Sequence, residues 1–270
     1  MESKMTGEQK NIAPIIRAEA LTKNFQGMVA LNAFDFSVNE GEIVGLIGPN
    51  GSGKSTVVNL LTGVLAPTSG RVLIDGKDFT GAAPHVVARH GVVRTFQMIR
   101  LFPSLTVERN IVLALQEQSG PGYMSSFLNR RNAMAWHEKA ACKARDMLAL
   151  FEMEKHAHKL ATDLSIGQQR MVELARGLAT NPRIFILDEP AAGLSPINVD
   201  RLIEMIRRMR DEFGVTILLV EHVMRVVQAV CDRVVVLDYG QKVADGKPDV
   251  VVQDPKVIEA YIGLGRSSHA

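Results

Sequence analysis

Apolar residues recur along this chain with two periods. One is typical of strands and the other of helices, and segments of the two kinds follow one another. Ala30–Val38 alternates apolar with polar residues, as a half-buried strand does. Short apolar runs predict further strands at 15–21, 42–47, 71–75, 184–187, 215–220 and 234–237. Apolar residues at helical spacing predict helices at 56–65 and 198–213. Because strands alternate with helices, we expect an α/β fold with a mostly parallel, covered sheet.

The pattern changes between residues 106 and 160, where helix-forming residues dominate, above all over 133–151. We interpret this stretch as an α-helical subdomain, at about 104–180, inserted into the sheet domain. The predicted organisation is therefore a flexible tail at 1–14, one domain at 15–263 and a short tail at 264–270.

Composition excludes several classes of protein. The chain has 270 residues, of which 46% are hydrophobic and 22% charged, with a net charge of +2. Its lysines and arginines are scattered, so no nucleic-acid partner is expected. Cys142 and Cys231 lie too far apart to read as a CxxC motif, which suits a reducing compartment. No apolar run approaches the roughly 20 residues of a membrane span, so a membrane role would be that of a peripheral subunit.

A glycine-rich loop follows the predicted strand at 42–47 and precedes the predicted helix at 56–65. It fits the pattern GxxxxGK[ST] with the residues Gly48, Pro49, Asn50, Gly51, Ser52, Gly53, Lys54 and Ser55, and Thr56 follows it. Backbone N–H groups of such a loop, with the helix N-terminus, bind phosphate. We expect Lys54 to reach the β- and γ-phosphates and the Ser55 hydroxyl to bind Mg²⁺. A glycine-rich turn without a ligand is the alternative.

Two adjacent carboxylates end the apolar strand at 184–187. Buried parallel strands deliver ligands from their carboxyl ends, so Asp188 should lie beside the phosphate loop and support Mg²⁺. Glu189 is then placed to orient or deprotonate an attacking water. The ordinary alternative is a strand end followed by acidic turn residues.

The segment Leu164-Ser165-Ile166-Gly167-Gln168 resembles the LSGGQ signature of the ABC-type ATPases. Three further residues resemble family positions: Gln97 the Q-loop glutamine, His222 the switch histidine and Phe25 the aromatic residue that stacks on adenine. Alone, each would be an ordinary surface or core residue. Their order and spacing over about 15–263 carry the resemblance.

This resemblance implies a P-loop NTPase nucleotide-binding domain with an N-terminal antiparallel β subdomain. It implies ATP and Mg²⁺ as ligands, contact of Gln97 with Mg²⁺, and catalytic roles for Lys54, Glu189 and His222. Two such domains pack head to tail, so ATP lies between residues 48–56 of one and Ser165, Gly167 and Gln168 of the other. The second domain can be this chain again or a paralogue.

Two residues depart from the family pattern. Ile166 replaces the first glycine of LSGGQ, which leaves Ser165 and Gly167 in place. Ser195 stands where many ABC proteins carry an aspartate, a position that bears on the coupling of the two active sites.

Within that family, the chain resembles the larger ATP-binding subunit of bacterial branched-chain amino acid importers. The resemblance is carried by residues 101–103, 105–107, the helical insert to about 160, 188–194 and 254–263. It implies permease subunits, a second ATPase subunit and a periplasmic solute-binding protein as partners, and a peripheral location on the cytoplasmic face of the inner membrane. A lipopolysaccharide-type exporter ATPase, and a soluble ABC ATPase acting on nucleic acid or ribosomes, are the alternatives.

The segment Gln97–Thr106 is apolar, with Met98, Ile99, Leu101 and Phe102 close together. The family places its permease contact beside the Q-loop, so we hypothesise that this segment is the contact. A loop that packs into the core is the alternative.

Overall fold

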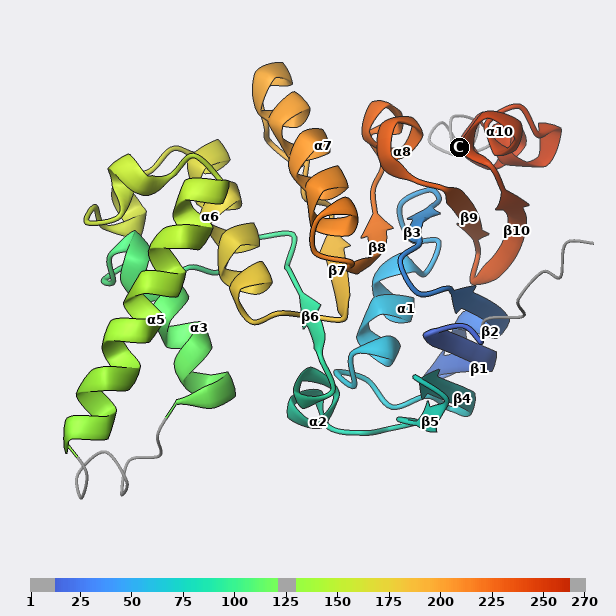
Figure 1. The fold of residues 1–270 in the computed structure, drawn as a ribbon. Helices are drawn as coiled ribbons and strands as arrows, with labels where there is room; N and C mark the ends of the chain where they lie inside the picture. The colour runs from blue at the N-terminus through green and yellow to red at the C-terminus, as the bar shows by residue number, and fades with distance from the viewer. Residues whose placement is uncertain (1–12, 121–129, 263–270) are drawn as a thin grey trace, which may run out of the picture.

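The computed structural model describes residues 13–120 and 130–262. The predicted tail at 264–270 and residues 1–12 of the predicted N-terminal tail lie outside these ranges. Figure 1 shows the described elements in three blocks, with a group of helices, a central sheet and a second sheet beside it.

The central sheet has the strand order β10-β9-β3-β8-β7-β6 in the described part of the chain. Its strands are β3 Ile43–Ile47, β6 Val92–Arg94, β7 Ile184–Asp188, β8 Thr216–Val220, β9 Arg233–Asp238 and β10 Gln241–Gly246. The pairs β3·β8, β3·β9, β7·β8 and β6·β7 are parallel, and β10 joins β9 as an antiparallel edge strand. The prediction of a mostly parallel core sheet is confirmed.

Successive residues of these strands enter two different apolar clusters. Ile43 and Ile47 of β3 join the cluster that contains helices α6 Ile166–Ala179, α7 Pro196–Asp211 and α8 Met224–Val230. Val44 and Leu46 join the cluster on the opposite face, with helix α1 Lys54–Leu61 and the second sheet. Because both faces are covered, the strands are apolar throughout.

The second sheet is antiparallel, in the order β2-β1-β4-β5. Its strands are β1 Ile16–Phe25, β2 Met28–Val38, β4 Ser69–Ile74 and β5 Lys77–Asp78. Leu31, Phe34, Phe36 and Val38 of β2 are buried, with one extra residue between the first two. That irregularity accompanies a positive φ of 42° at Ala33, as a β-bulge does.

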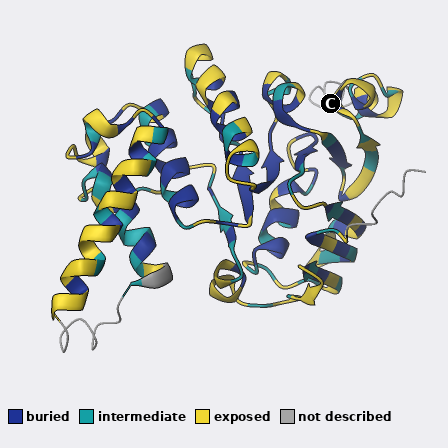
Figure 2. Ribbon diagram, in the orientation of Figure 1, coloured by how far each residue is buried: buried dark blue, intermediate teal, exposed yellow. Residues whose placement is uncertain are grey.

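The inserted helices are α3 Val107–Ser119, α5 Arg130–Leu150 and α6, with short 3-10 turns η1 Glu154–His156 and η2 Ala161–Asp163. They pack against one another, and α5 buries Ala140, Ala144 and Leu148 at four-residue spacing. Ala133 is buried as well, and exposed residues run along the other side of α5 (Figure 2). The remaining helices are α2 Pro84–Arg89, α9 Pro248–Val251 and α10 Pro255–Ile262. Among the described helices, none is long and apolar enough to cross a bilayer.

Several predicted boundaries shift for identifiable reasons. The helix predicted at 56–65 begins at Lys54, directly after the loop, and its C-cap is Thr62. The helix predicted at 198–213 begins at Pro196, where a fixed φ suits the first turn. Strands β5, β6 and β10 were not predicted, because the first two have only two and three residues and half of the residues of β10 are polar.

Candidate functional site

The glycine-rich loop joins the buried strand β3 to helix α1, as its motif requires. Gly53 is the N-cap of α1 with φ of 108°, a conformation that favours glycine. A Cβ on Gly48 would lie 2.0 Å from the carbonyl oxygen of Leu237 in β9. Any side chain at Gly48 would therefore clash with the backbone of β9, so this position requires glycine.

Lys54 lies inside this loop. Its side chain is buried, and its Nζ donates to the carbonyl oxygens of Gly48 and Pro49 at 2.7 and 2.8 Å. Burial lowers the pKa of Lys54, and the carboxylates of Glu189 and Asp188 oppose that shift. The Oγ of Ser52 is also buried and has no hydrogen-bond partner within the described residues. A buried cation and a free hydroxyl inside a glycine-lined loop fit a bound phosphate.

Asp188, at the end of β7, joins three elements. Its Oδ2 accepts a 2.8 Å hydrogen bond from Nη2 of Arg94 in β6. The Nη1 of Arg94 donates to Oδ1 of Asn59 in α1 at 2.6 Å. Arg94 therefore ties the carboxylate to the helix that follows the phosphate loop. Sequence reasoning assigned Arg94 no role, because its partners lie far from it along the chain.

Oxygen atoms of Ser55 and Asp188 could hold a divalent cation. Ser55 is exposed in the first turn of α1, and Asp188 is the last residue of strand β7 in the central sheet. In the described ranges no group of three or more His, Cys, Asp or Glu residues is arranged around a metal site. One hydroxyl and one carboxylate, completed by phosphate oxygens and water, form the kind of set that suits Mg²⁺.

Glu189 lies where three of the expected residues meet. Its Oε2 accepts a 2.8 Å hydrogen bond from Nε2 of Gln97 and is 4.0 Å from Nδ1 of His222. The backbone at Glu189 has a φ of 47°, which is uncommon for residues other than glycine. Its N–H donates to the carbonyl of Val220 in β8 at 2.9 Å, which holds this turn in place.

The signature residues lie at the start of α6. Ser165 and Gln168 form a capping box, in which each side chain accepts from the backbone N–H of the other. The Nε2 of Gln168 lies 3.1 Å from Nε2 of His156. A Cβ on Gly167 would lie 2.3 Å from Asn198 in α7. Figure 1 shows α6 and α1 separated by β6 and β7, so the signature segment and the glycine-rich loop of one chain lie apart.

A buried ion pair links the signature helix to the Q-loop. Arg170 and Glu173 in α6 have side chains 1% and 2% exposed, with Nη1 and Oε2 2.5 Å apart. Arg170 also donates to the carbonyl oxygens of Phe96 and Gln97, both at 3.1 Å. Sequence reasoning missed this pair, although charged residues three apart in an apolar helix were a visible signal.

Phe25 lies at the β1–β2 turn. Its ring is partly exposed, with Nζ of Lys23 5.1 Å from the ring centroid. The same hairpin reaches the phosphate loop at Ala30, whose carbonyl oxygen would lie 2.7 Å from a Cβ on Gly53. A flat, accessible ring on this hairpin is compatible with stacking on a base.

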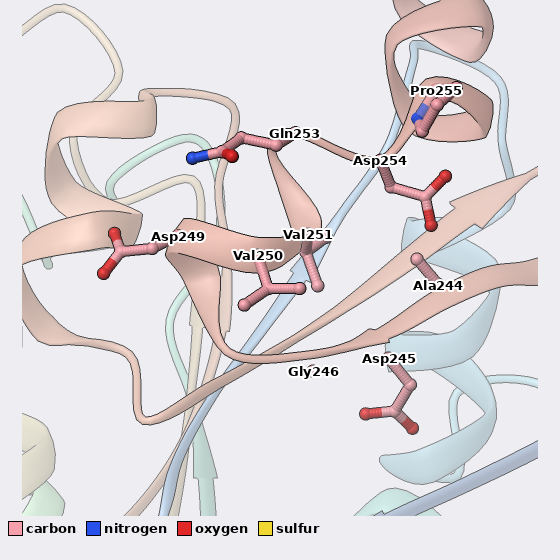
Figure 3. Close-up of a pocket in the computed structure, with 9 residues that line it drawn as sticks. All are labelled: Ala244, Asp245, Gly246, Asp249, Val250, Val251, Gln253, Asp254 and Pro255. Carbon is pink, nitrogen blue, oxygen red and sulfur yellow. The ribbon is translucent and has the colours of Figure 1, made fainter.

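A separate hollow of about 590 Å³ lies between β10, α9 and the start of α10. Figure 3 shows that the Asp249 and Asp254 side chains point away from each other. Asp245 is paired with Arg233 and Lys242. Without converging polar groups, and with three carboxylates around it, this hollow is poorly suited to a phosphate.

Residues 31–192 match the family described as "ABC transporter". The chain belongs to the ABC transporter family. Residues 241–265 also match the family "Branched-chain amino acid ATP-binding cassette transporter". The chain is 40% identical to the high-affinity branched-chain amino acid transport ATP-binding protein BraF of Pseudomonas aeruginosa, over 93% of this chain and 98% of that protein.

Solved structures of other ATP-binding cassettes are similar. The ADP conformation of MJ1267, an ATP-binding cassette of an ABC transporter, superposes with a TM-score of 0.80 at 34% identity, covering 93% of this chain and 99% of that one. The dimeric MJ0796, a bacterial ABC transporter cassette, superposes with a TM-score of 0.73 at 27% identity, covering 86% and 98%.

As an ABC transporter ATPase, this chain binds and hydrolyses ATP. Around the phosphate loop, the structure brings together the predicted residues Lys54, Gln97, Asp188, Glu189 and His222. The signature residues stay in the helical block at the start of α6.

Proposed function

We propose that this ABC transporter ATPase drives the import of branched-chain amino acids, as a peripheral subunit on the cytoplasmic face of the inner membrane. The observation that carries the substrate class is the match of residues 241–265 to the branched-chain family, in addition to the general ABC match. The relatedness to BraF over nearly its full length supports the same assignment.

The proposed roles follow from the positions of the side chains. Lys54 binds the β- and γ-phosphates, and the N–H groups of 48–56 hold their oxygens. Ser55, Gln97 and Asp188 supply oxygen ligands for Mg²⁺, which when bound neutralises phosphate charge. Glu189 accepts a proton from, or orients, the attacking water. His222 and Gln97, which both lie next to Oε2 of Glu189, position this carboxylate and the attacking water.

The second half of each site comes from another subunit in this proposal. Ser165, Gly167 and Gln168 form a helix N-terminus that suits phosphate but lies away from the chain's own loop. Head-to-tail pairing of the proposed domain 15–263 places them over a partner's ATP. Binding then favours the closed pair, and hydrolysis lets it open.

Alanine at Lys54 removes the buried cation of the phosphate loop. We expect Lys54→Ala to bind ATP roughly 10- to 100-fold more weakly, because hydrogen bonds to charged groups contribute about 1.5–3 kcal/mol each. Titration calorimetry measures this affinity, with exposed Lys77→Ala in β5 as the control. Unchanged affinity in Lys54→Ala would contradict the phosphate-loop assignment.

The segment 97–106 divides into core and surface residues. Leu101 is half-buried and packs against the main apolar cluster, as the core alternative predicted for the whole loop. Met98 and Phe102 are 81% and 49% exposed. We propose that the exposed side chains of Met98 and Phe102 receive the permease.

Phe102→Asp tests this docking surface. A central aromatic anchor of an interface contributes about 2 kcal/mol or more, so transport should fall by at least about 30-fold while ATP binding persists. Phe213→Asp, at a phenylalanine that is 39% exposed after α7, serves as the control. Loss of folding in Phe102→Asp, judged by its thermal midpoint, would support the core-packing alternative instead.

Co-purification tests the proposed function as a whole. Tagged Glu189→Gln protein is expressed in its native cell, and membranes are solubilised in mild detergent with ATP and Mg²⁺. Recovery of two permeases and a second ATPase is the expected result. Exporter-type membrane subunits would favour the lipopolysaccharide-type alternative, and ribosomes without membrane subunits would overturn the transport proposal.

A further inference from the structure

Glu221 is a buried carboxylate between strand β8 and His222. Its side chain is fully buried, at 0% relative exposure. Its Oε1 accepts a 2.7 Å hydrogen bond from the N–H of Ala191, and its Oε2 accepts from the N–H groups of His222 and Val223 at 3.0 and 3.1 Å. One carboxylate therefore holds two loops that come from different strands.

The first of these loops carries Glu189. The N–H of Glu189 donates to the carbonyl oxygen of Val220, and the N–H of Ala191, two residues later, donates to the Glu221 carboxylate. The turn with positive φ at Glu189 is therefore held on both sides by consecutive residues at the end of β8. A displacement of Glu221 would loosen this turn.

The second loop carries His222. Because Glu221 bonds the backbone N–H groups of His222 and Val223, it sets the direction in which the chain leaves β8. The His222 ring then lies 4.0 Å from the Glu189 carboxylate. The separation of these two side chains thus depends on a third carboxylate that faces neither solvent nor the phosphate loop.

A buried carboxylate is costly unless it is well bonded. No lysine or arginine side chain in the described ranges is bonded to Glu221, so the donors to its side-chain oxygens are the backbone N–H groups of Ala191, His222 and Val223. Three hydrogen bonds from two different loops, at 2.7, 3.0 and 3.1 Å, converge on this one side chain.

We propose that Glu221 is a positioning residue for ATP hydrolysis, which holds Glu189 and His222 at their working separation through the backbones of both loops. This inference rests on the catalytic roles proposed for Glu189 and His222. It assigns Glu221 no contact with ATP.

Glu221→Gln keeps the size of the side chain but offers one oxygen and one NH₂ group. If the oxygen faces Ala191, the NH₂ group opposes the N–H donors of His222 and Val223, and the reverse placement opposes Ala191. A displacement near 1 Å can lower a rate by about 100-fold. In the full-length chain, kcat should therefore fall by about this factor, while KM for ATP stays within about 2-fold because the phosphate loop is untouched.

Glu42→Gln is the matched control. Glu42 accepts from the N–H of Asn39 and from Arg233, and it precedes β3 at the opposite end of the sheet. Glu42→Gln should lower the thermal midpoint and leave kcat unchanged. If Glu221→Gln gives the same result, a lower midpoint and a kcat within about 2-fold of the parent, then Glu221 is a structural residue and the inference is wrong.

A double-mutant cycle with His222→Ala separates positioning from general loosening. Residues that act through one another give non-additive losses, so the combined loss in kcat should fall at least about 10-fold short of the product of the single losses. A multiplicative loss would overturn the inference. If Glu189→Gln and His222→Ala alone keep the parental rate, the proposed catalytic roles fail, and this inference fails with them. If both lose activity and Glu221→Gln does not, the Glu221 inference alone fails.

Discussion

Glu189→Gln should hydrolyse ATP about 10²- to 10⁴-fold more slowly than the parent, the usual range for loss of a general base. The carboxylate is the group that Gln97 and His222 both face, and an amide cannot accept a proton from water. Glutamine and glutamate tolerate a positive φ equally, so the backbone at this position should not change. ATP binding should persist, and the protein should accumulate as a dimer. Phosphate release and size-exclusion chromatography with ATP measure the two effects.

Glu152→Gln is the matched control for this variant. Glu152 also has a positive φ, of 54°, but its side chain is 74% exposed and pairs with Arg201 on the surface. Its loss should leave hydrolysis unchanged. Parental turnover in Glu189→Gln would show that another group handles the proton, and the assignment would be wrong.

Arg170→Leu should lower the free energy of unfolding by about 3–5 kcal/mol, because it leaves the Glu173 carboxylate buried without its partner. For a domain of this size that is a fall of roughly 6–20 °C in the thermal midpoint. The Q-loop should also loosen, since the carbonyls of Phe96 and Gln97 lose their donor. Circular dichroism during heating measures the stability.

Arg208→Leu provides the contrast. Arg208 and Glu212 form a pair on α7 at 2.8 Å, but their side chains are 33% and 49% exposed. Exposed pairs contribute about 0–1 kcal/mol, so the midpoint should barely move. Replacing both Arg170 and Glu173 with leucine should recover part of the loss, because no unpaired charge remains. Equal midpoints for Arg170→Leu and Arg208→Leu would show that the buried pair is dispensable.

Local sequence was sufficient for the phosphate loop and the longest elements. The loop could be predicted because glycines, a lysine and a serine at set spacing need only a preceding strand and a following helix, which are themselves local patterns. The helix expected at 133–151 occurs as α5, and the strand expected at 184–187 occurs as β7. The first was identified by its long run of helix-forming residues, and the second by its dense run of apolar residues.

Edge strands were beyond such reasoning. β6 has three residues, and β10 is partly exposed and rich in polar residues. Each becomes a strand because a neighbour, β7 or β9, offers unpaired backbone groups at the sheet edge. The segment 97–106 shows the same limit, since its apolar residues alone could not reveal that Leu101 packs inward while Met98 faces solvent.

By itself, the sequence determined the phosphate loop and the pair of carboxylates, because each consists of residues close together along the chain. It also determined the family, through the order and spacing of motifs over about 15–263. Only the tertiary structure decided which side chains hold those residues in place. Arg94 meets Asp188 across 94 positions, Arg170 meets Phe96 across 74, and Glu221 meets Ala191 across 30. Such pairings depend on strand order and helix packing, which bring distant segments within hydrogen-bond distance and leave no periodic mark in the sequence.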